Sequence, residues 1–426
     1  MSDLKSQIEE FGRRARAAAR VLARTSSAQK NAGLLAMADE IVNAAGPILE
    51  ANAQDLASAA ANGLAKPMVE RLTLNTKRLE AMADGIRQVA ALPDPVGENI
   101  RDWTRPNGLR ISKVRVPIGV VGIIYESRPN VTSDAAVLCT KTGNATILRG
   151  GSESIHSNVA IAAALSRGAA QAGLPADSVL LIPTTDREAV RHLCAMDKYL
   201  DVIVPRGGKG LIETVVSHAR MPVIKHYDGI CIMYVDQAAD LAMAESIVIN
   251  AKCQRPGVCN AIETVLVHKE VAAQFFATTG KALLAQGVQL RCDERSLTLA
   301  SALGGPGANV VAATPEDFRT EFLDLILAVR IVDSLNEAID HIENHGSHHS
   351  DGIVTADATT AERFLAEVDS ATVYWNASTR FTDGGEFGFG AEIGISTDKL
   401  HARGPMALEE LTTYKYLLRG TGQIRS

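Results

Sequence analysis

The hydrophobic pattern along the chain changes near residue 118. From residue 3 to residue 91, apolar residues recur at helical spacing in an alanine-rich background, with breaks at 45–47 and 63–67. After residue 118, short apolar runs alternate with helical stretches. Strands are expected at 118–125, 145–149, 178–182 and 201–204, and a helix at 155–172. This order predicts an α/β fold with a parallel sheet covered by helices on both faces.

A second alternating series predicts a second α/β lobe. It has an apolar strand at 230–235, a helix at 239–250, a strand that follows residue 260, a helix after Lys269, and strands at 352–355 and 371–375. The chain has 426 residues, which is too long for one ordinary core. Two lobes are therefore expected, and pockets favour the boundary between such lobes.

Two β-prone segments stand outside both lobes. Residues 103–116 place Asn107-Gly108 between two alternating stretches, which predicts a β-hairpin. An isolated two-stranded ribbon is marginal in water, so this hairpin needs support from another part of the chain or from a second subunit. The tail at 411–418 is a strand with no later partner in the sequence. Both segments are candidates for assembly with another copy.

Composition limits the cellular compartments and the classes of binding partner that we expect for this protein. The formal charge is −6 with acids and bases interspersed, so neither nucleic acid nor an anionic membrane is predicted as a partner. The six cysteines form no CxxC pair, as expected for reduced thiols, and Glu9 and Glu10 argue against a transit peptide. We expect a cytoplasmic protein. The histidines at 345, 348 and 349 lack a cysteine or carboxylate at metal-site spacing, so no metal is predicted.

Cys259 is the first candidate for chemistry. Pro256 and Gly257 prevent regular structure just before it, and β-branched residues follow it, so the thiol lies where a loop enters a sheet. A nucleophile is often placed in this way. The alternative is a small buried side chain, because free cysteine is commonly buried and inert.

The first lobe has the order of a dinucleotide-binding domain, although no GxGxxG follows its strands. The turn at Arg206, Gly207 and Gly208 is the available substitute, because small residues let backbone N–H groups approach phosphate oxygens. A tight turn beside an exposed lysine explains the same residues equally well.

Four motifs resemble one family. They are QRPGVCNA at 254–261, ESRPNV at 126–131, NATILRGGSE at 144–153, and the long block at 376–405. Together they resemble the γ-glutamyl phosphate reductases, the proline-pathway branch of the aldehyde dehydrogenase superfamily, over nearly the whole chain. The resemblance implies an NADP-binding domain at 1–100 and 118–226, a catalytic domain at 227–405, and an oligomerisation element made of 101–117 and 406–426.

The resemblance also implies an activity. Members reduce L-glutamyl 5-phosphate to L-glutamate 5-semialdehyde with NADPH in proline biosynthesis and release phosphate. A thiolate can attack this activated carbonyl and leave a thioester that accepts a hydride. A CoA-acylating or non-phosphorylating aldehyde dehydrogenase is one alternative, and a catalytically silent scaffold homologue is another. A dimer or tetramer is implied, and association with a glutamate kinase is plausible because the acyl phosphate cyclises readily.

The family pattern assigns the reacting groups. Cys259 matches the nucleophile, and Asn130 matches the asparagine that stabilises the oxyanion together with the Cys259 backbone N–H. Oxidising members of the superfamily carry a glutamate general base in a motif like ELGGK. This chain has KHYDG at 225–229 instead, which argues against simple aldehyde oxidation.

Guanidinium groups suit the two anions of such a substrate. The candidates are Arg128, Arg255 and Arg380, each of which could hold either anion, with Ser378 and Thr379 as further donors.

For the cofactor, Arg149 with Ser152 suits a 2′-phosphate, whereas Glu153 is shifted by one position from the carboxylate that prefers a free 2′-hydroxyl. Glu321 matches the glutamate that holds the nicotinamide ribose.

Overall fold

The computed structural model describes residues 2–126, 128–303 and 309–425, and the chain divides into two compact units. Unit 1 contains Met1–Lys225, Gly388–Ile395 and Pro405–Ser426, and unit 2 contains His226–Phe387 and Ser396–Gly404. The change of unit after Lys225 lies within one residue of the predicted boundary. The later part differs from the prediction, because residues 388–395 return to unit 1 instead of staying in the catalytic domain.

Unit 1 begins with a helical segment, as predicted. Its helices are α1 (Ser2–Leu22), α2 (Ser27–Asn43), α3 (Ala45–Ala61), α4 (Lys66–Leu72) and α5 (Thr76–Ala91). The side chains of Ser26 and Asn75 accept backbone N–H bonds at the starts of α2 and α5. Among the described helices, no single one is long and apolar enough to cross a bilayer. Only α2 and α3 taken together reach that length, across a 65° bend.

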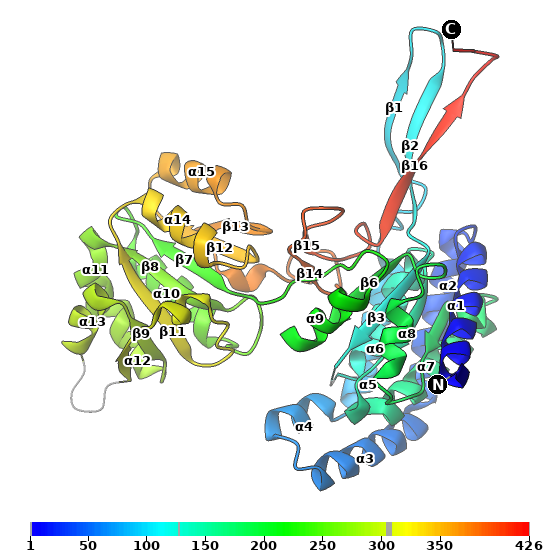
Figure 1. Cartoon of the computed structure of the whole chain (residues 1–426), viewed down its shortest axis with the longest axis horizontal. Coiled ribbons are helices and arrows are strands. Elements are labelled where there is room, and N and C mark those ends of the chain that lie inside the picture. The colour runs from blue at the N-terminus through cyan, green and yellow to red at the C-terminus, as the bar shows by residue number, and fades with distance from the viewer. Residues whose placement is uncertain (1, 127, 304–308, 426) are drawn as a thin grey trace. The chain divides into compact units, whose positions relative to one another are not determined.

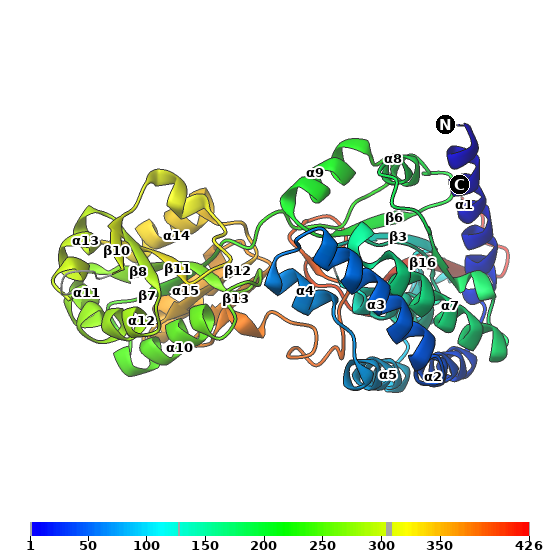
Figure 2. The ribbon, with the colours of Figure 1, turned by 90° about the horizontal axis from the view of Figure 1, so that it is seen from below.

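A four-stranded parallel sheet forms the centre of unit 1, in the order β5-β4-β3-β6. Helices α1 and α8 contact each other, as do α6 and α7, and Figure 2 shows α8 and α7 on opposite sides of β3 and β6. Every residue of β3 and β4 is buried, which explains the predominance of apolar residues in both strands. The elements are β3 (Val120–Tyr125), α6 (Asn130–Lys141), β4 (Ala145–Arg149), η1 (Ser152–Ser154), α7 (Ile155–Gln171), η2 (Ala176–Ser178), β5 (Val179–Leu181), α8 (Glu188–Cys194), β6 (Val202–Arg206) and α9 (Lys209–His218).

The predicted hairpin and the predicted C-terminal strand pair with each other. Strands β1 (Asn99–Thr104), β2 (Arg110–Pro117) and β16 (Thr412–Arg419) form an antiparallel sheet in the order β1-β2-β16. Gly108 has a φ of 84° in the hairpin turn, as an Asn-Gly turn requires. Figure 1 shows this sheet, hereafter the arm, extending away from the rest of unit 1. The hairpin therefore gains its support from the chain's own C-terminal strand.

Unit 2 contains a seven-stranded parallel sheet in the order β10-β9-β11-β8-β7-β12-β13. The strand that follows Cys259, β8, is buried along its whole length between β11 and β7. The strands are β7 (Cys231–Val235), β8 (Ile262–His268), β9 (Gln289–Cys292), β10 (Val310–Ala312), β11 (Ile326–Val332), β12 (Ser350–Val354) and β13 (Thr372–Trp375). The helical elements are α10 (Leu241–Cys253), α11 (Lys269–Phe275), η3 (Phe276–Gly280), α12 (Lys281–Ala285), α13 (Glu294–Ser301), η4 (Pro315–Arg319), α14 (Leu335–His345), α15 (Ala358–Glu367) and η5 (Thr379–Phe381). A separate pair, β14 (Ile395–Ser396) and β15 (Gly404–Pro405), forms a two-stranded sheet.

Three strands of unit 2 are absent from the sequence-based prediction, which passes from the helix after Lys269 directly to residues 352–355. Strands β9 and β10 have four and three residues, too few to show a periodicity. Strand β11 does carry a signal, because its sequence ILAVRIV is apolar and β-branched. Its place between β9 and β8 makes it part of the centre of the sheet.

Candidate active site

Cys259 lies in the loop between α10 and β8, three residues before the strand begins, as the sequence predicts. The thiol residue is half-buried. Its carbonyl oxygen accepts a hydrogen bond from the Cys231 Sγ at 3.1 Å. A Cβ atom on Gly229 would lie 2.1 Å from the same oxygen and 2.6 Å from the Cys259 Cα, so this glycine packs directly against the Cys259 backbone. The segments that lead into β7 and β8 therefore hold Cys259 at the amino ends of two paired strands.

A buried ion pair joins the two elements on either side of this loop. Lys252, in the last turn of α10, lies 2.5 Å from the Glu263 carboxylate on β8, and both side chains are fully buried. Burial lowers the pKa of Lys252 and raises the pKa of Glu263 to about 7, while their contact opposes both shifts. The second Glu263 oxygen accepts the Leu323 N–H at 3.3 Å. This ion pair fixes the end of α10 relative to the start of β8, the two elements that the Cys259 loop connects.

Two predicted arginines lie close to Cys259 within unit 2. The Arg380 Nε donates to the Gln254 Oε1 at 2.8 Å. Burial lowers the pKa of Arg380, the charge of Arg255 lowers it further, and Cys259 opposes these shifts, so Arg380 is near enough to interact with both groups. Arg255 itself is exposed. The structure thus groups Cys259 with two guanidinium cations.

The turn η5 is bonded to the residue that follows Cys259. The Thr379 hydroxyl donates to the Asn260 carbonyl at 2.7 Å, and the Asn260 Nδ2 donates to the Thr382 carbonyl at 2.9 Å. Thr379 is fully buried, and Ser378, 6% exposed, accepts the Arg380 N–H. The two side chains thus hold the turn that carries Arg380. The Ser378 hydroxyl accepts a bond here and still has its own proton to donate, whereas the Thr379 proton is used within the chain. Binding of substrate by these two hydroxyls stays a prediction.

Two histidines, neither of them predicted as a site residue, face Cys259. One nitrogen each from His226 and His349 and the Cys259 Sγ all lie within 4.8 Å of one another. The two rings meet edge to face, with centroids 5.2 Å apart. Burial lowers the pKa of His349 well below its usual range, and His226 lowers it further. The sequence shows no cysteine near residues 345–349, but the fold brings Cys259 close to His349. Sequence spacing alone therefore could not reveal this group of potential metal ligands.

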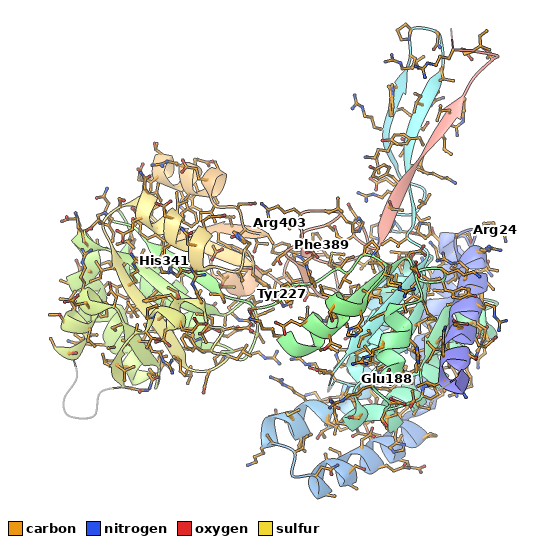
Figure 3. The ribbon with its side chains drawn as sticks, viewed as in Figure 1. Arg24, Glu188, Tyr227, His341, Phe389 and Arg403 are labelled. Atoms are coloured by element: carbon orange, nitrogen blue, oxygen red, sulfur yellow. The ribbon has the colours of Figure 1, made fainter. Side chains whose placement is uncertain are left out.

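Glu321 has a partner at the same site. Its Oε1 accepts the Gly229 N–H at 2.9 Å, so this carboxylate holds the glycine that packs against Cys259. The predicted contact of Glu321 with a ribose remains a prediction. Beside Gly229 lies a cavity of about 280 Å³, and Tyr227 on its wall is labelled in Figure 3. Its lining residues are Tyr227, Asp228, Ile230, Arg319, His345, Gly346, Ser347 and Thr397. None of the predicted substrate-binding residues belongs to this lining.

In unit 1, Asn130 is the first residue of α6 and is exposed. Its amide nitrogen donates to the Asp134 Oδ2 at 2.9 Å. Burial raises the pKa of Asp134 to about 6, and the Asn130 amide opposes this shift. The preceding Arg128 is half-buried, and Ser127 of the same motif lies outside the described residues. Asp134 therefore orients the predicted oxyanion-stabilising amide.

Three of the predicted cofactor residues, Arg149, Ser152 and Glu153, lie together at the carboxyl end of β4. Arg149 is 8% exposed and donates to the carbonyls of Gly150 and Thr185 at 2.9 and 3.2 Å. Burial lowers the pKa of Arg149, and the Glu153 carboxylate opposes this shift. The Ser152 hydroxyl donates to Glu153 at 3.3 Å. One cation, one hydroxyl and one carboxylate are thus grouped as the sequence motif suggests.

The turn at Arg206, Gly207 and Gly208 holds a carboxylate of the chain itself. The Gly208 N–H, at the start of α9, donates to the Glu126 Oε2 at 2.9 Å. A helix N-terminus attracts an anion, and here Glu126 occupies that place. Binding of a cofactor phosphate at this turn stays a prediction.

Residues 3–295 match the model of the aldehyde dehydrogenase family. A γ-glutamyl phosphate reductase from Opitutus terrae is 56% identical over 426 residues, with 100% of both chains covered. One from Moorella thermoacetica is 57% identical over 419 residues, with 98% of this chain and 99% of the relative covered.

A crystal structure is similar over the same length. It is that of the γ-glutamyl phosphate reductase from Thermotoga maritima, with a TM-score of 0.95 and 44% identity, covering 98% of this chain and 100% of that one. These similarities confirm the resemblance inferred from the four motifs and the expected aldehyde dehydrogenase fold.

Proposed function

Because the chain belongs to the γ-glutamyl phosphate reductases of the aldehyde dehydrogenase family, we propose that it reduces L-glutamyl 5-phosphate to L-glutamate 5-semialdehyde with NADPH and releases phosphate. The observation that carries this proposal is the placement of Cys259. Its backbone is held by Gly229 and Cys231, and Arg380 interacts electrostatically with both Cys259 and Arg255. A thiol among cations is suited to attack an acyl phosphate.

The Cys259 thiol first loses its proton to solvent, and the thiolate then attacks the acyl carbon. A C–S bond forms, the bond from carbon to the phosphate oxygen breaks, and phosphate leaves with the electron pair. The guanidinium groups of Arg255 and Arg380 stabilise the departing phosphate through charge-assisted hydrogen bonds. The product on the enzyme is a thioester. Asn130 and the Cys259 backbone N–H are assigned to the oxyanion of this step and the next.

Arg149 and Ser152 fit the 2′-phosphate of NADPH. The Arg149 Nε is buried and has no hydrogen-bond partner within the described part of the chain, which suits an anionic ligand at that end of β4. When bound, NADPH supplies the hydride that reduces the thioester carbonyl. The chain then holds the tetrahedral oxygen until the C–S bond breaks, which releases the aldehyde and restores the Cys259 thiolate.

The requirement for phosphate tests this proposal. In the reverse direction, glutamate 5-semialdehyde and NADP⁺ should yield NADPH only when inorganic phosphate is present. NADPH formation that continues undiminished without phosphate would overturn the proposal in favour of a non-phosphorylating dehydrogenase. Formation that needs coenzyme A instead would identify a CoA-acylating enzyme.

The Gly229→Ala substitution should impair turnover. The new Cβ would lie 2.1 Å from the Cys259 carbonyl oxygen, so the backbone that carries the nucleophile has to move. Displacement of a reacting group by about 1 Å lowers activity by about 100-fold. We expect kcat/KM for L-glutamyl 5-phosphate to fall by about that factor. Gly210→Ala is the matched control, because no atom lies within 4 Å of its Cβ position. Equal kcat/KM values in the two variants would contradict the assigned contact.

We also propose that the arm joins copies of the chain into an oligomer. Tyr414, Tyr416 and Leu418 alternate along β16 on one face and are 48%, 52% and 59% exposed. Trp103 meets Tyr416 edge to face at 6.1 Å, which adds a second ring to this apolar face. A contiguous exposed apolar surface of this kind marks an interaction site.

The double substitution Tyr416→Asp and Leu418→Asp should therefore lower the molar mass measured by light scattering after gel filtration. Thr413→Asp, an exposed position on the opposite face of β16, is the control and should leave the mass unchanged. A double variant with the mass of the unmodified protein would rule out this face as the subunit contact.

A further inference from the structure

Three potential metal ligands meet at the amino ends of three neighbouring strands. His226 precedes β7, Cys259 precedes β8 and His349 immediately precedes β12. Strand β7 lies between β8 and β12 in the sheet, so strand pairing itself brings the three residues together. Their candidate ligand atoms lie within 4.8 Å of one another.

The surroundings of His349 provide a second observation, separate from the proximity of the three side chains, that points to a bound ion. Its ring is fully buried, and its Nδ1 lies 2.8 Å from the Ser350 Oγ and 3.6 Å from the Cys231 Sγ. Its Nε2 is buried and has no hydrogen-bond partner among the residues that the structure describes. A buried polar atom without a hydrogen-bond partner destabilises the fold, so its presence requires an explanation. A metal-binding histidine has the same arrangement, with one ring nitrogen held by a neighbour and the other left for the ion.

We propose that His226, Cys259 and His349 bind a thiophilic divalent cation such as Zn²⁺. Two imidazole nitrogens and one thiolate form a donor set that suits Zn²⁺, whereas Mg²⁺ and Ca²⁺ prefer oxygen ligands. Zinc bonds of about 2.0–2.3 Å place tetrahedral ligand atoms closer together than 4.8 Å, so modest side-chain rotations complete the site. The fourth position stays open to water or an anion.

Binding would block the nucleophile. The thiol loses its proton to solvent as the Zn–S bond forms, and a metal-bound sulfur cannot attack an acyl phosphate. The cation is therefore a reversible inhibitor. This last consequence rests on the proposed function, whereas the binding of the metal does not.

The test uses the full-length protein, freed of metal with a chelator and reduced. Cobalt(II) is added first, and a thiolate-to-cobalt charge-transfer band with intense visible bands is expected at one ion per chain. Zinc affinity is then measured by competition with a chromophoric chelator. His226→Asn, His349→Asn and Cys259→Ala should each weaken Zn²⁺ binding by at least about 10-fold, since each removes a ligand.

His348→Asn is the matched control. His348 stands beside His349 but its Nδ1 bonds the Asp369 carbonyl, and its φ of 57° is one that asparagine tolerates. Its zinc affinity should equal that of the unmodified protein. Thermal melting checks whether each variant folds. If the variant of the buried His349 fails to fold, the zinc affinity of the His226 variant tests the site, because His226 is only half-buried.

A cobalt complex without the thiolate band, or one zinc affinity shared by all variants, would overturn the site. In the unmodified protein, Zn²⁺ should inhibit reduction of L-glutamyl 5-phosphate, and a chelator should restore it. Full activity with zinc bound would overturn the inhibitory role. A protein that binds cobalt through Cys259 but never reduces the acyl phosphate would instead refute the proposed function while upholding the metal site.

Discussion

Replacement of Cys259 by alanine is expected to lower kcat for NADPH-dependent reduction of L-glutamyl 5-phosphate by more than about 10⁴-fold. In the proposed mechanism the thiolate forms the covalent intermediate, and no neighbouring thiol is placed to substitute for it. Cys231 is fully buried, and burial raises the pKa of its thiol well above the usual value. The measurement is the loss of NADPH absorbance under saturating substrate, together with NADPH binding and thermal melting, which should both remain unchanged.

Cys253→Ala is the matched control for this experiment. Cys253 is a half-buried thiol at the end of α10, and burial raises its pKa too, so it should react slowly. We expect the Cys253 variant to keep kcat within about 2-fold of the unmodified enzyme, since the side chain serves packing alone. A Cys259→Ala protein that still turned over, or an equal loss in the Cys253 variant, would refute the assignment. The same assay separates an enzyme from a catalytically silent scaffold homologue, because a silent homologue would show no turnover in the unmodified protein or in either variant.

Lys252→Met is expected to lower the free energy of unfolding by about 3–5 kcal/mol, which makes it the most destabilising change that we predict. The substitution leaves the Glu263 carboxylate fully buried without its partner at 2.5 Å. Unfolding in urea, followed by circular dichroism, measures the effect. Because the pair joins α10 to β8, the same variant should also loosen the Cys259 loop, and kcat/KM should fall below that of the unmodified enzyme.

The matched control is the double substitution Lys252→Met and Glu263→Leu. It removes both charges and should recover most of the lost stability, because apolar side chains can replace a buried ion pair. A double variant as unstable as Lys252→Met would show that packing, and not the unpaired carboxylate, accounts for the loss.

The pH dependence of the single variant follows from the same contact. Burial already raises the pKa of Glu263 to about 7, and loss of Lys252 raises it further. The pKa of this carboxyl is higher in the folded state than its value of about 4.3 in the unfolded chain. Its contribution to stability is therefore fully present below about pH 4.3 and is lost as the pH rises through the folded-state pKa. The deficit of Lys252→Met should therefore be smaller near pH 5 than near pH 8. An equal deficit at both values would argue against a buried charge as its cause.

The buried parallel strands were the most predictable part of the fold. Strand β4 has the predicted bounds, and β3 begins two residues later than predicted. Both are buried on two faces, so their sequences are mainly apolar, and local patterns reveal them. Strands β9 and β10 were missed because they are too short for such a pattern. The pairing of β16 with β2 joins segments that are far apart in the sequence, which periodicity cannot report.

Local sequence was a weaker guide to the roles of polar side chains. The motif around Arg380 predicts Ser378 and Thr379 as substrate donors, and the structure adds that both side chains also bond the turn and the loop. Gly208 offers an N–H that suits phosphate, and Glu126, the residue after β3, accepts it in this structure. Whether a donor is free depends on what packs against it, and that partner is distant in sequence.

The sequence by itself determined the two α/β series, the loop that presents Cys259, and the family, because each depends on residues adjacent along the chain. Only the tertiary structure decided which side chains meet Cys259. His226, Cys259 and His349 come together because β7 pairs with β8 on one side and β12 on the other. Strand order is set by packing of the whole sheet, so no local pattern in the sequence contains it.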